Sequence, residues 1–318
     1  MKYIKDIREG DSVSSIYLCR KKEIGKKKNG EDYFALVLTD KTGSLDGKIW
    51  NINNPGVAEF EAGDYVRIEA VTNLFNQRIQ LIVNRLTKCS EGEYDPEDYL
   101  PSTSKNVNSM YKELMEIIKS VKNSKLRTLL ENVFVNDKAV AKAFSEHSAA
   151  KTVHHAFRGG LLEHTLSVTR NCIAFAENYP ILNRDVLLTA AMLHDIGKLN
   201  ELSALPENDY TDEGQLLGHI YMGAEFVGKK IDQIPDFPQK LRNEIIHCIL
   251  AHHGKLEFGS PKKPALAEAF ALSMADDLDA KMETMSELFD TAVSDEGWLG
   301  FQKNFDSNIR KTGRYEQE

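Results

Sequence analysis

The sequence predicts a two-domain protein, in which a small N-terminal β-barrel precedes an all-α domain. The length of 318 residues suits about two domains of roughly 150 residues each. Alternating apolar and β-branched runs fill residues 1–88, whereas from Val107 onward apolar residues recur every three or four positions, as on a buried helix face. Apolar residues make up 42% of the chain, which is enough for two cores.

Five strands are expected within residues 1–88. The predicted strands are Ser12–Arg20, Asp32–Thr39, Leu45–Trp50, the run from Gly63 through Val66, Ile68 and Ala70, and Arg78–Arg85. The first two flank a polar segment, Lys21–Glu31, and the third follows a turn signal at Asp40–Gly43. A short helix is expected at Pro55–Glu61. Five strands with one short helix before the fourth strand are the order of an OB-fold.

The turn Thr39–Gly43 followed by Ile49-Trp50 resembles nucleic-acid-binding OB domains related to anticodon-binding domains.

The charge of the chain is unevenly distributed. Residues 1–88 carry a net charge of +3 within a chain whose net charge is −8, so the remainder carries −11. The acidic total argues against a simple basic nucleic-acid binder, and most of the acidic excess is expected on solvated helix surfaces.

The remainder of the chain divides into four predicted segments. A Pro- and Gly-containing acidic stretch, 89–104, reads as a linker. Residues 105–149 read as a helical connector, in which Met110, Leu114 and Ile117 define a buried face. Helical patterning then continues through 150–292, the principal helical domain, and residues 293–318 form a C-terminal tail.

Several protein classes are not favoured. The chain contains no apolar run of about 18 residues, so no membrane span is expected. Met1–Asp11 lacks a signal-peptide pattern. The four cysteines form no CxxC pair, which gives no support for a zinc knuckle or a redox motif. We therefore expect reduced thiols and a cytoplasmic protein.

The histidines and aspartates of the helical domain form an ordered series. Its members are His164, His194-Asp195, His219, His252-His253 and Asp276. Each lies on a helix-like segment beside small residues. Packed helix positions are usually apolar, so clustered histidine and aspartate there indicate metal ligation.

This series resembles the HD superfamily of metal-dependent phosphohydrolases across about residues 150–290. The resemblance implies that one metal is held by His164, His194, Asp195 and Asp276. It implies a second metal at His219, His252 and His253, with Asp195 as the bridge. Adjacent helical residues point about 100° apart, so His253 could instead orient a ligand without binding the metal itself.

The donor types constrain the metal and its chemistry. Imidazole together with carboxylate suits Mn, Fe, Co, Ni or Zn, whereas an oxygen-only set would suit Mg. Two such ions about 3.5–4 Å apart can clamp a phosphodiester and lower the pKa of a bridging water. Asp195 is the expected catalytic carboxylate, and Lys198, one helical turn later, is expected to offset phosphate charge.

A narrower resemblance covers nearly the whole chain. The segment from His154 to Thr165, His-His-Ala-Phe-Arg-Gly-Gly-Leu-Leu-Glu-His-Thr, looks like the segment that precedes the first ligand in YhaM-type 3′–5′ exoribonucleases. That family also joins an N-terminal OB domain to a C-terminal HD domain. The resemblance implies Mn- or Co-supported removal of 5′-mononucleotides from the 3′ end of single-stranded RNA, with single-stranded DNA as a further candidate substrate.

Some candidate substrate contacts have an equally plain alternative. His154, His155 and Arg158 would either bind substrate phosphate or form a packed loop. Lys26, Lys27 and Lys28 would either follow a nucleic-acid backbone or form a solvated hairpin tip. Tyr33, Phe34, Trp50 and Phe75 are candidates for base stacking or for the core; Tyr33 and Phe34 point to opposite faces of one strand, so at most one should be exposed. Asp277 and Asp279 are expected to be solvated helix residues, with orientation of a metal ligand as the alternative.

Two rival functions remain open. An HD phosphohydrolase acting on nucleotides or cyclic dinucleotides would share the ligand series. However, the Gly-Tyr-Pro run expected after the histidine pair is absent, since Gly254 is followed by Lys255-Leu256-Glu257. A non-catalytic nucleic-acid-binding adaptor would lack a ligand, and no ligand is missing from the series. The sequence determines neither the oligomeric state nor the preference for RNA over DNA.

Overall fold

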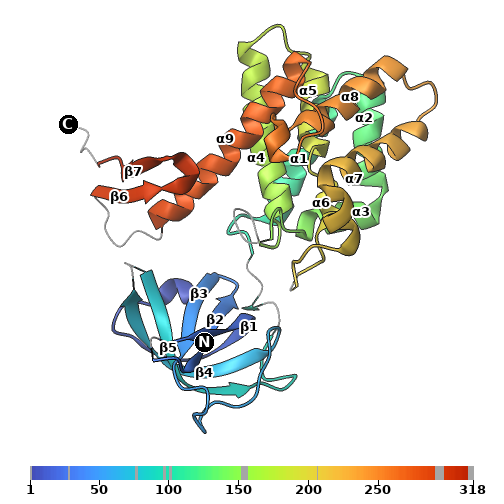
Figure 1. Cartoon of the computed structure of the whole chain (residues 1–318). Helices are drawn as coiled ribbons and strands as arrows, with labels where there is room; N and C mark the ends of the chain where they lie inside the picture. The colour runs from blue at the N-terminus through green and yellow to red at the C-terminus, as the bar shows by residue number, and fades with distance from the viewer. Residues whose placement is uncertain are drawn as a thin grey trace. The chain divides into compact units, whose positions relative to one another are not determined.

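The structure is a computed structural model that describes residues 2–27, 29–75, 78–95, 98–99, 102–151, 157–205, 207–290 and 297–313. It contains two compact units. One consists of Met1–Tyr99 with Lys281–Glu318, and the other of Leu100–Ala280. Figure 1 shows both units, with the chain coloured from blue at the N-terminus to red at the C-terminus.

A closed five-stranded barrel forms most of the first unit. Its strands are β1 (Ser12–Lys26), β2 (Asp32–Asp40), β3 (Gly43–Ile49), β4 (Tyr65–Phe75) and β5 (Arg78–Lys88). The order around the barrel is β1-β2-β3-β5-β4, and every pairing is antiparallel except that of β3 with β5. Inward-facing residues such as Tyr17, Leu38 and Ile68 are fully buried and fill the barrel. This closed barrel confirms the predicted OB-fold.

The first strand is longer than predicted. The polar segment after Arg20 was expected to leave the sheet, but β1 continues to Lys26. Lys22 pairs with Leu36 and Lys26 with Asp32, after a bulge between Cys19 and Lys21. A hairpin arm whose side chains are solvated requires no apolar alternation, because its backbone hydrogen bonds alone maintain the pairing.

The helix predicted at Pro55–Glu61 is wrong. This segment forms a turn and then runs extended, with a single parallel bridge from Val57 to Leu86. The amide of Ala58 donates to the carbonyl of Leu86, and the amide of Leu86 donates to the carbonyl of Gly56. Because its backbone groups are satisfied by the neighbouring strand, the segment gains nothing from a helical turn.

The second unit is an α-helical domain. Its helices are α1 (Val107–Ser120), α2 (Ser124–Glu131), α3 (Lys138–Glu146), α4 (Gly160–Asn178), α5 (Arg184–Leu193), α6 (Lys198–Glu201), α7 (Asp212–Asp232) and α8 (Gln239–Ala251), together with α9 (Ala267–Asp290). A π-helical segment, Asn132–Asn136, follows α2. The helix α5 is buried from Val186 to Leu193, and α2, α4 and α8 pack against it. The predicted all-α domain is thereby confirmed.

Side-chain caps begin several of these helices. Asn123 accepts hydrogen bonds from the amides of Lys125 and Leu126 at the start of α2. Asp137 caps α3, and Thr211 caps α7. Such caps satisfy amides that have no partner within the helix, and thereby fix where each helix begins.

The C-terminal tail contains secondary structure that the sequence did not suggest. Strands β6 (Gly297–Gln302) and β7 (Ser307–Lys311) form an antiparallel hairpin. Asp306 turns the chain with a positive φ of 47°. An aspartate tolerates this conformation better than most residues, which explains how a turn forms there without glycine.

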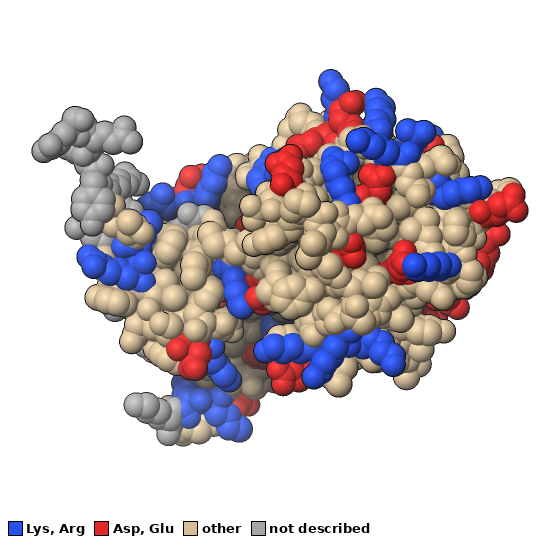
Figure 2. Space-filling model, turned by 90° about the horizontal axis from the view of Figure 1, so that it is seen from above, with Lys and Arg blue, Asp and Glu red and all other residues tan. Residues whose placement is uncertain are grey.

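Acidic and basic side chains are interspersed over the face shown in Figure 2. Exposed ion pairs of the helical unit include Lys229 with Glu225 and Arg170 with Glu113. The four cysteines are buried and free. Within the described residues, no helix combines the length and apolar composition that a membrane crossing requires.

Candidate metal centre

The predicted ligands come together inside the helical unit from five different elements. His164 lies on α4, and His194-Asp195 directly follows α5. His219 lies on α7, and Asp276 lies on α9. His252 ends α8, and His253 is the next residue. Positions that are far apart in the sequence therefore converge at one place.

A first group contains His164, His194 and Asp276. The Nε2 atom of His164 lies 3.2 Å from Nε2 of His194 and 3.2 Å from Oδ1 of Asp276. Donors around one transition-metal ion lie about 2.0–2.2 Å from it, which places neighbouring donors about 3–3.6 Å apart. The spacing in this group therefore fits ligation of a single ion.

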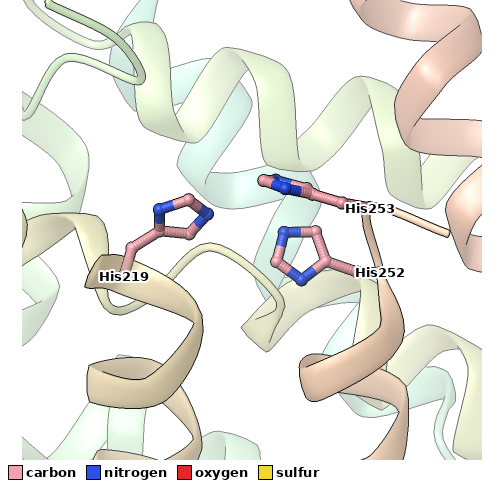
Figure 3. A group of neighbouring side chains, drawn as sticks. All are labelled: His219, His252 and His253. Carbon is pink, nitrogen blue, oxygen red and sulfur yellow. The ribbon is translucent and has the colours of Figure 1, made fainter. Parts of the chain in front are cut away.

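A second group contains His219, His252 and His253. Figure 3 shows the three rings facing one another, with His219 coming from α7 and the other two from the end of α8. One donor atom of each lies within 4.8 Å of those of the other two. Burial lowers the pKa of both His252 and His253, so these two imidazoles are neutral, as a metal ligand must be.

Asp195 lies between the two groups. Its Oδ2 atom is 3.4 Å from His164 Nε2 and 3.3 Å from His194 Nε2. Its Oδ1 atom is 3.6 Å from Nε2 of both His219 and His252. These last three atoms, Asp195 Oδ1 and the two Nε2 atoms, are buried and have no hydrogen-bond partner. Unpaired buried polar atoms that converge on one point fit a bound cation well.

All five histidines of the two groups present the same ring atom to the centre. The Nδ1 atom of His164 contacts Asp279 Oδ2 (2.7 Å), and that of His219 contacts Glu201 Oε1 (2.9 Å). The other three Nδ1 atoms contact backbone carbonyls: His194 that of Ala191 (2.8 Å), His252 that of Ile249 (2.7 Å) and His253 that of Phe258 (2.7 Å). Because each partner is an acceptor, Nδ1 carries the proton and Nε2 is left with its lone pair.

The prediction that Asp279 is a solvated residue is wrong. It is 8% exposed, and its carboxylate accepts from both His164 Nδ1 and the Ser167 hydroxyl. Asp279 lies three positions after Asp276 on α9, so the two share a helix face. That spacing was the available signal. Asp277 is exposed, as expected.

Glu201 was not identified from the sequence. It ends α6 and is 8% exposed. Its Oε1 atom accepts hydrogen bonds from both the backbone amide and Nδ1 of His219, each at 2.9 Å. No periodicity or motif in the sequence joins these two positions, which are 18 residues apart.

Lys198 lies beside the carboxylate of Asp195. Its Nζ atom is 2.7 Å from Asp195 Oδ2, and the side chain is 17% exposed. Burial lowers the pKa of Lys198, but the charge of Asp195 outweighs burial and raises it, so the ammonium stays charged. Burial alone would raise the pKa of Asp195, yet Lys198 and His194 hold it well below its ordinary value.

The electrostatic field at His164 is negative. Burial lowers the pKa of its imidazole, but hydrogen bonds with Asp195, Asp276 and Asp279 raise it well above 6.5. The same carboxylates that favour an imidazolium here also favour a divalent cation.

A cavity of about 280 Å³ opens onto the centre. His164, Lys198, His253 and Asp276 line it, together with Phe258, whose ring is exposed. Cavities with a few convergent polar groups beside apolar walls are typical ligand sites. This one has room for a small ligand next to both groups of histidines.

The predicted substrate contacts lie in varied surroundings. Lys26 pairs with Asp32, and Lys27 with Glu31, both at 2.9 Å on the exposed β1–β2 arm. Arg158 contacts Glu146 at 2.8 Å. Lys28, His154 and His155 lie outside the described residues.

Aromatic residues of the barrel separate as the strand geometry predicted. Phe34 packs against the barrel core, edge-on to Phe60. Tyr33 points to the other face, where its ring lies 4.9 Å from that of Trp50, which is 42% exposed. Lys48 Nζ lies 5.1 Å from the Tyr33 ring.

The fold and the centre together define an HD-domain protein. The model of the HD domain family matches residues 161–281, which contain every member of the two groups and the bridging Asp195. Metal dependence is characteristic of such domains, and the chain carries the His/Asp groups that this requires.

The chain belongs to the YhaM family. It is 32% identical over 279 residues to the 3′-5′ exoribonuclease YhaM of Halalkalibacterium halodurans, covering 87% of this chain and 85% of the relative. It is also 32% identical over 280 residues to the protein of the same name from Bacillus velezensis, covering 87% of each. The family suggested by the His154–Thr165 segment is thereby confirmed.

One solved structure matches the barrel region only distantly. It is the second OB-fold domain of replication protein A from Methanococcus maripaludis, at 20% identity and a TM-score of 0.24, covering 30% of this chain and 100% of that one. The assignment of the barrel therefore rests on its own strand order.

Proposed function

We propose that the chain is a metal-dependent 3′–5′ exoribonuclease that hydrolyses single-stranded RNA to 5′-mononucleotides. The family relationship carries this proposal, because it extends over 87% of the chain and so includes both units. Single-stranded DNA is a second candidate substrate. The reduced, buried cysteines suit a cytoplasmic location, where RNA is the abundant polymer.

The proposed cofactor is a pair of divalent ions. The mixed imidazole and carboxylate donors suit Mn, Fe, Co, Ni or Zn, and the family resemblance favours Mn or Co among these. One ion would be held by His164, His194, Asp195 and Asp276, and the other by His219, His252, His253 and Asp195. When bound, such a pair supplies Lewis acidity and a water of lowered pKa next to the phosphodiester. Asp195 has one oxygen facing each group, which suits a bridging ligand.

The chain's own residues would hold the terminal nucleotide. The Lys198 ammonium lines the cavity and would offset phosphate charge. Phe258 offers an exposed ring at the same cavity, on which a base would stack. A stacking contact of this kind tolerates any base, as an exonuclease that degrades mixed sequences requires.

The barrel would gather the single strand. Tyr33, which is partly buried, and the exposed Trp50 form an aromatic pair, and Lys48 supplies a positive charge beside it. The functional division that we propose is an RNA-gathering domain at 1–88, a linker at 89–104, a helical connector at 105–149 and a catalytic domain at 150–292, followed by the tail at 293–318. Contacts from Lys26, Lys27, Lys28, His154, His155 and Arg158 to the phosphate backbone are part of the same proposal.

The test is digestion of one single-stranded RNA labelled at either end. With Mn²⁺, the 3′-labelled strand should release labelled mononucleotide at once, and the 5′-labelled strand should shorten as a ladder. EDTA removes the ions, and the variant Asp195→Asn removes the proposed bridge between them. Each should therefore reduce the rate at least about 100-fold. His247→Asn changes a histidine outside the centre, where it accepts from the Ala265 amide, and should retain activity.

Other outcomes would redirect the assignment. A 5′-labelled strand that released its label first would contradict the proposed polarity. Intact RNA in the presence of Mn²⁺ would overturn the exonuclease proposal, and mononucleotides and cyclic dinucleotides would then be the substrates to assay. A DNA strand of the same sequence, run in parallel, measures the preference between the two polymers.

A further inference from the structure

We infer that Glu201 is the positioning residue that gives the three-histidine half of the centre its affinity for metal. This inference rests on the proposed binding of two ions. It concerns a residue outside the His/Asp series, at the end of a four-residue helix, α6.

The contact is specific in geometry. One oxygen of Glu201, Oε1, receives both the backbone amide and the ring Nδ1 of His219, each at 2.9 Å. The hydrogen bond from the amide fixes the backbone of His219 within α7. The hydrogen bond from Nδ1 fixes the rotation of the His219 ring. Nε2 of His219 is thereby aimed at the centre, where it is buried without a partner.

The backbone around Glu201 leaves this contact little freedom. A Cβ atom at Gly214 would lie 2.2 Å from the Glu201 carbonyl oxygen, and one at Gly197 would lie 2.1 Å from the His219 carbonyl oxygen. Only glycine fits at either contact between α6 and α7. Gly218, with φ 72° and ψ 154°, kinks α7 directly before His219. Three glycines thus shape the junction at which one carboxylate meets one ligand.

The charge at this half of the centre is otherwise low. Its three members are all histidines, and among the described residues the carboxylates in contact with them are Asp195, at 3.6 Å from His219 and His252, and Glu201. The other half contacts Asp195, Asp276 and Asp279. A carboxylate that accepts the far ring proton of a histidine makes that histidine a stronger donor to a metal. Loss of one charge should therefore matter most where the fewest are present.

The experiment compares Mn²⁺ binding to the full chain and to three variants by calorimetric titration, checked by electron paramagnetic resonance of the free ion. Glu201→Gln keeps the size and the accepting oxygen but removes the charge. It should weaken one of the two binding events about 10–100-fold and leave the other unchanged. Asp279→Asn removes the equivalent support from His164 and should weaken the other event. His219→Asn should affect the same event as Glu201→Gln.

Three results would overturn the inference: a titration of Glu201→Gln that superimposes on wild type, an equal loss of both events, or a wild-type chain that binds no Mn²⁺. The melting temperature without metal should be nearly the same for Glu201→Gln and wild type. If Glu201→Gln does not fold, Glu201→Asp replaces it; its shortened carboxylate should weaken the same event. Selective loss of one event in a chain that digests no RNA would support this inference while refuting the exonuclease proposal.

Discussion

Gly218 adopts a backbone conformation that side chains strongly disfavour. With φ 72° and ψ 154°, it lies in a region populated almost only by glycine. The residue after it is the ligand His219. A single backbone angle therefore directs one donor towards the centre.

The substitution Gly218→Ala should lower the free energy of unfolding by about 1–3 kcal/mol, because alanine is strained at this angle. It should also weaken Mn²⁺ binding, since His219 is displaced from Glu201. Urea unfolding followed by circular dichroism, together with Mn²⁺ titration, measures both effects.

Gly228→Ala is the matched control on the same helix, α7. Its Cβ would meet only the end of the Arg242 side chain, at 3.1 Å, and that side chain can move. The control should therefore be neutral or slightly stabilising, since alanine favours helix by about 1 kcal/mol over glycine. Equal losses in the two variants would refute the argument from backbone strain.

At the scale of helices, Asp137 joins two elements. It caps α3 by accepting from the Val140 amide, and it contacts Lys230 of α7 at 2.9 Å. The hydrogen bond from Lys230 is the largest influence that lowers the pKa of Asp137 below 3.8. A carboxyl with a depressed folded-state pKa stabilises the fold above its unfolded pKa, and this contribution is lost as pH falls through the folded value.

The variant Asp137→Asn should therefore be less stable than wild type at pH 7, by under about 1 kcal/mol because the pair is partly solvated. The difference should shrink as the pH falls below the unfolded pKa of Asp137, and it should vanish once the pH lies below the folded pKa. Urea midpoints at several pH values test this. Asp232→Asn, which removes a 64% exposed partner of Arg242, should show no such trend. A gap that widened on acidification would contradict the sign.

Most elements could be predicted because their cause is local. The apolar spacing of Met110, Leu114 and Ile117 specifies the buried face of α1, and strand alternation specifies the barrel. The Pro55–Glu61 segment could not be predicted, because its conformation depends on pairing with β5.

The same distinction between local and tertiary causes applies to the residues of the metal centre. The histidines and aspartates that converge at the centre could be singled out, because these residue types are rare at packed helix positions. Glu201 could not, since nothing local indicates that the end of α6 meets the kink of α7. Asp279 was recognisable only by its spacing from Asp276. Residues that act through another residue leave a weak trace in sequence, because their partner is defined by tertiary structure.

At the scale of the whole molecule, the two cores share no residue among those described. One cluster contains residues between Met110 and Ala275, and another fills the barrel from Ile7 to Leu86. Both tryptophans, Trp50 and Trp298, belong to the unit that contains the barrel. Tryptophan fluorescence and helical circular dichroism therefore report on different units.

Saturating Mn²⁺ should raise the melting midpoint seen at 222 nm by about 5–10 °C, because a ligand at 100 times its Kd adds about 2.7 kcal/mol. The midpoint seen by tryptophan fluorescence should not move. Asp195→Asn should abolish the shift at 222 nm. Coincident shifts in both signals would mean that the two units unfold as one.

The five histidines hold their ring protons on the far side of the centre through contacts that are already in place, three of them with backbone carbonyls. An arriving ion thus finds its donors oriented, and one metal can replace another without repacking of the helices. Affinity should then follow the general order in which Cu and Zn exceed Mn. The metal carried in a living cell would be decided by supply, so that a change in metal homeostasis would alter this protein's activity without any change in its sequence.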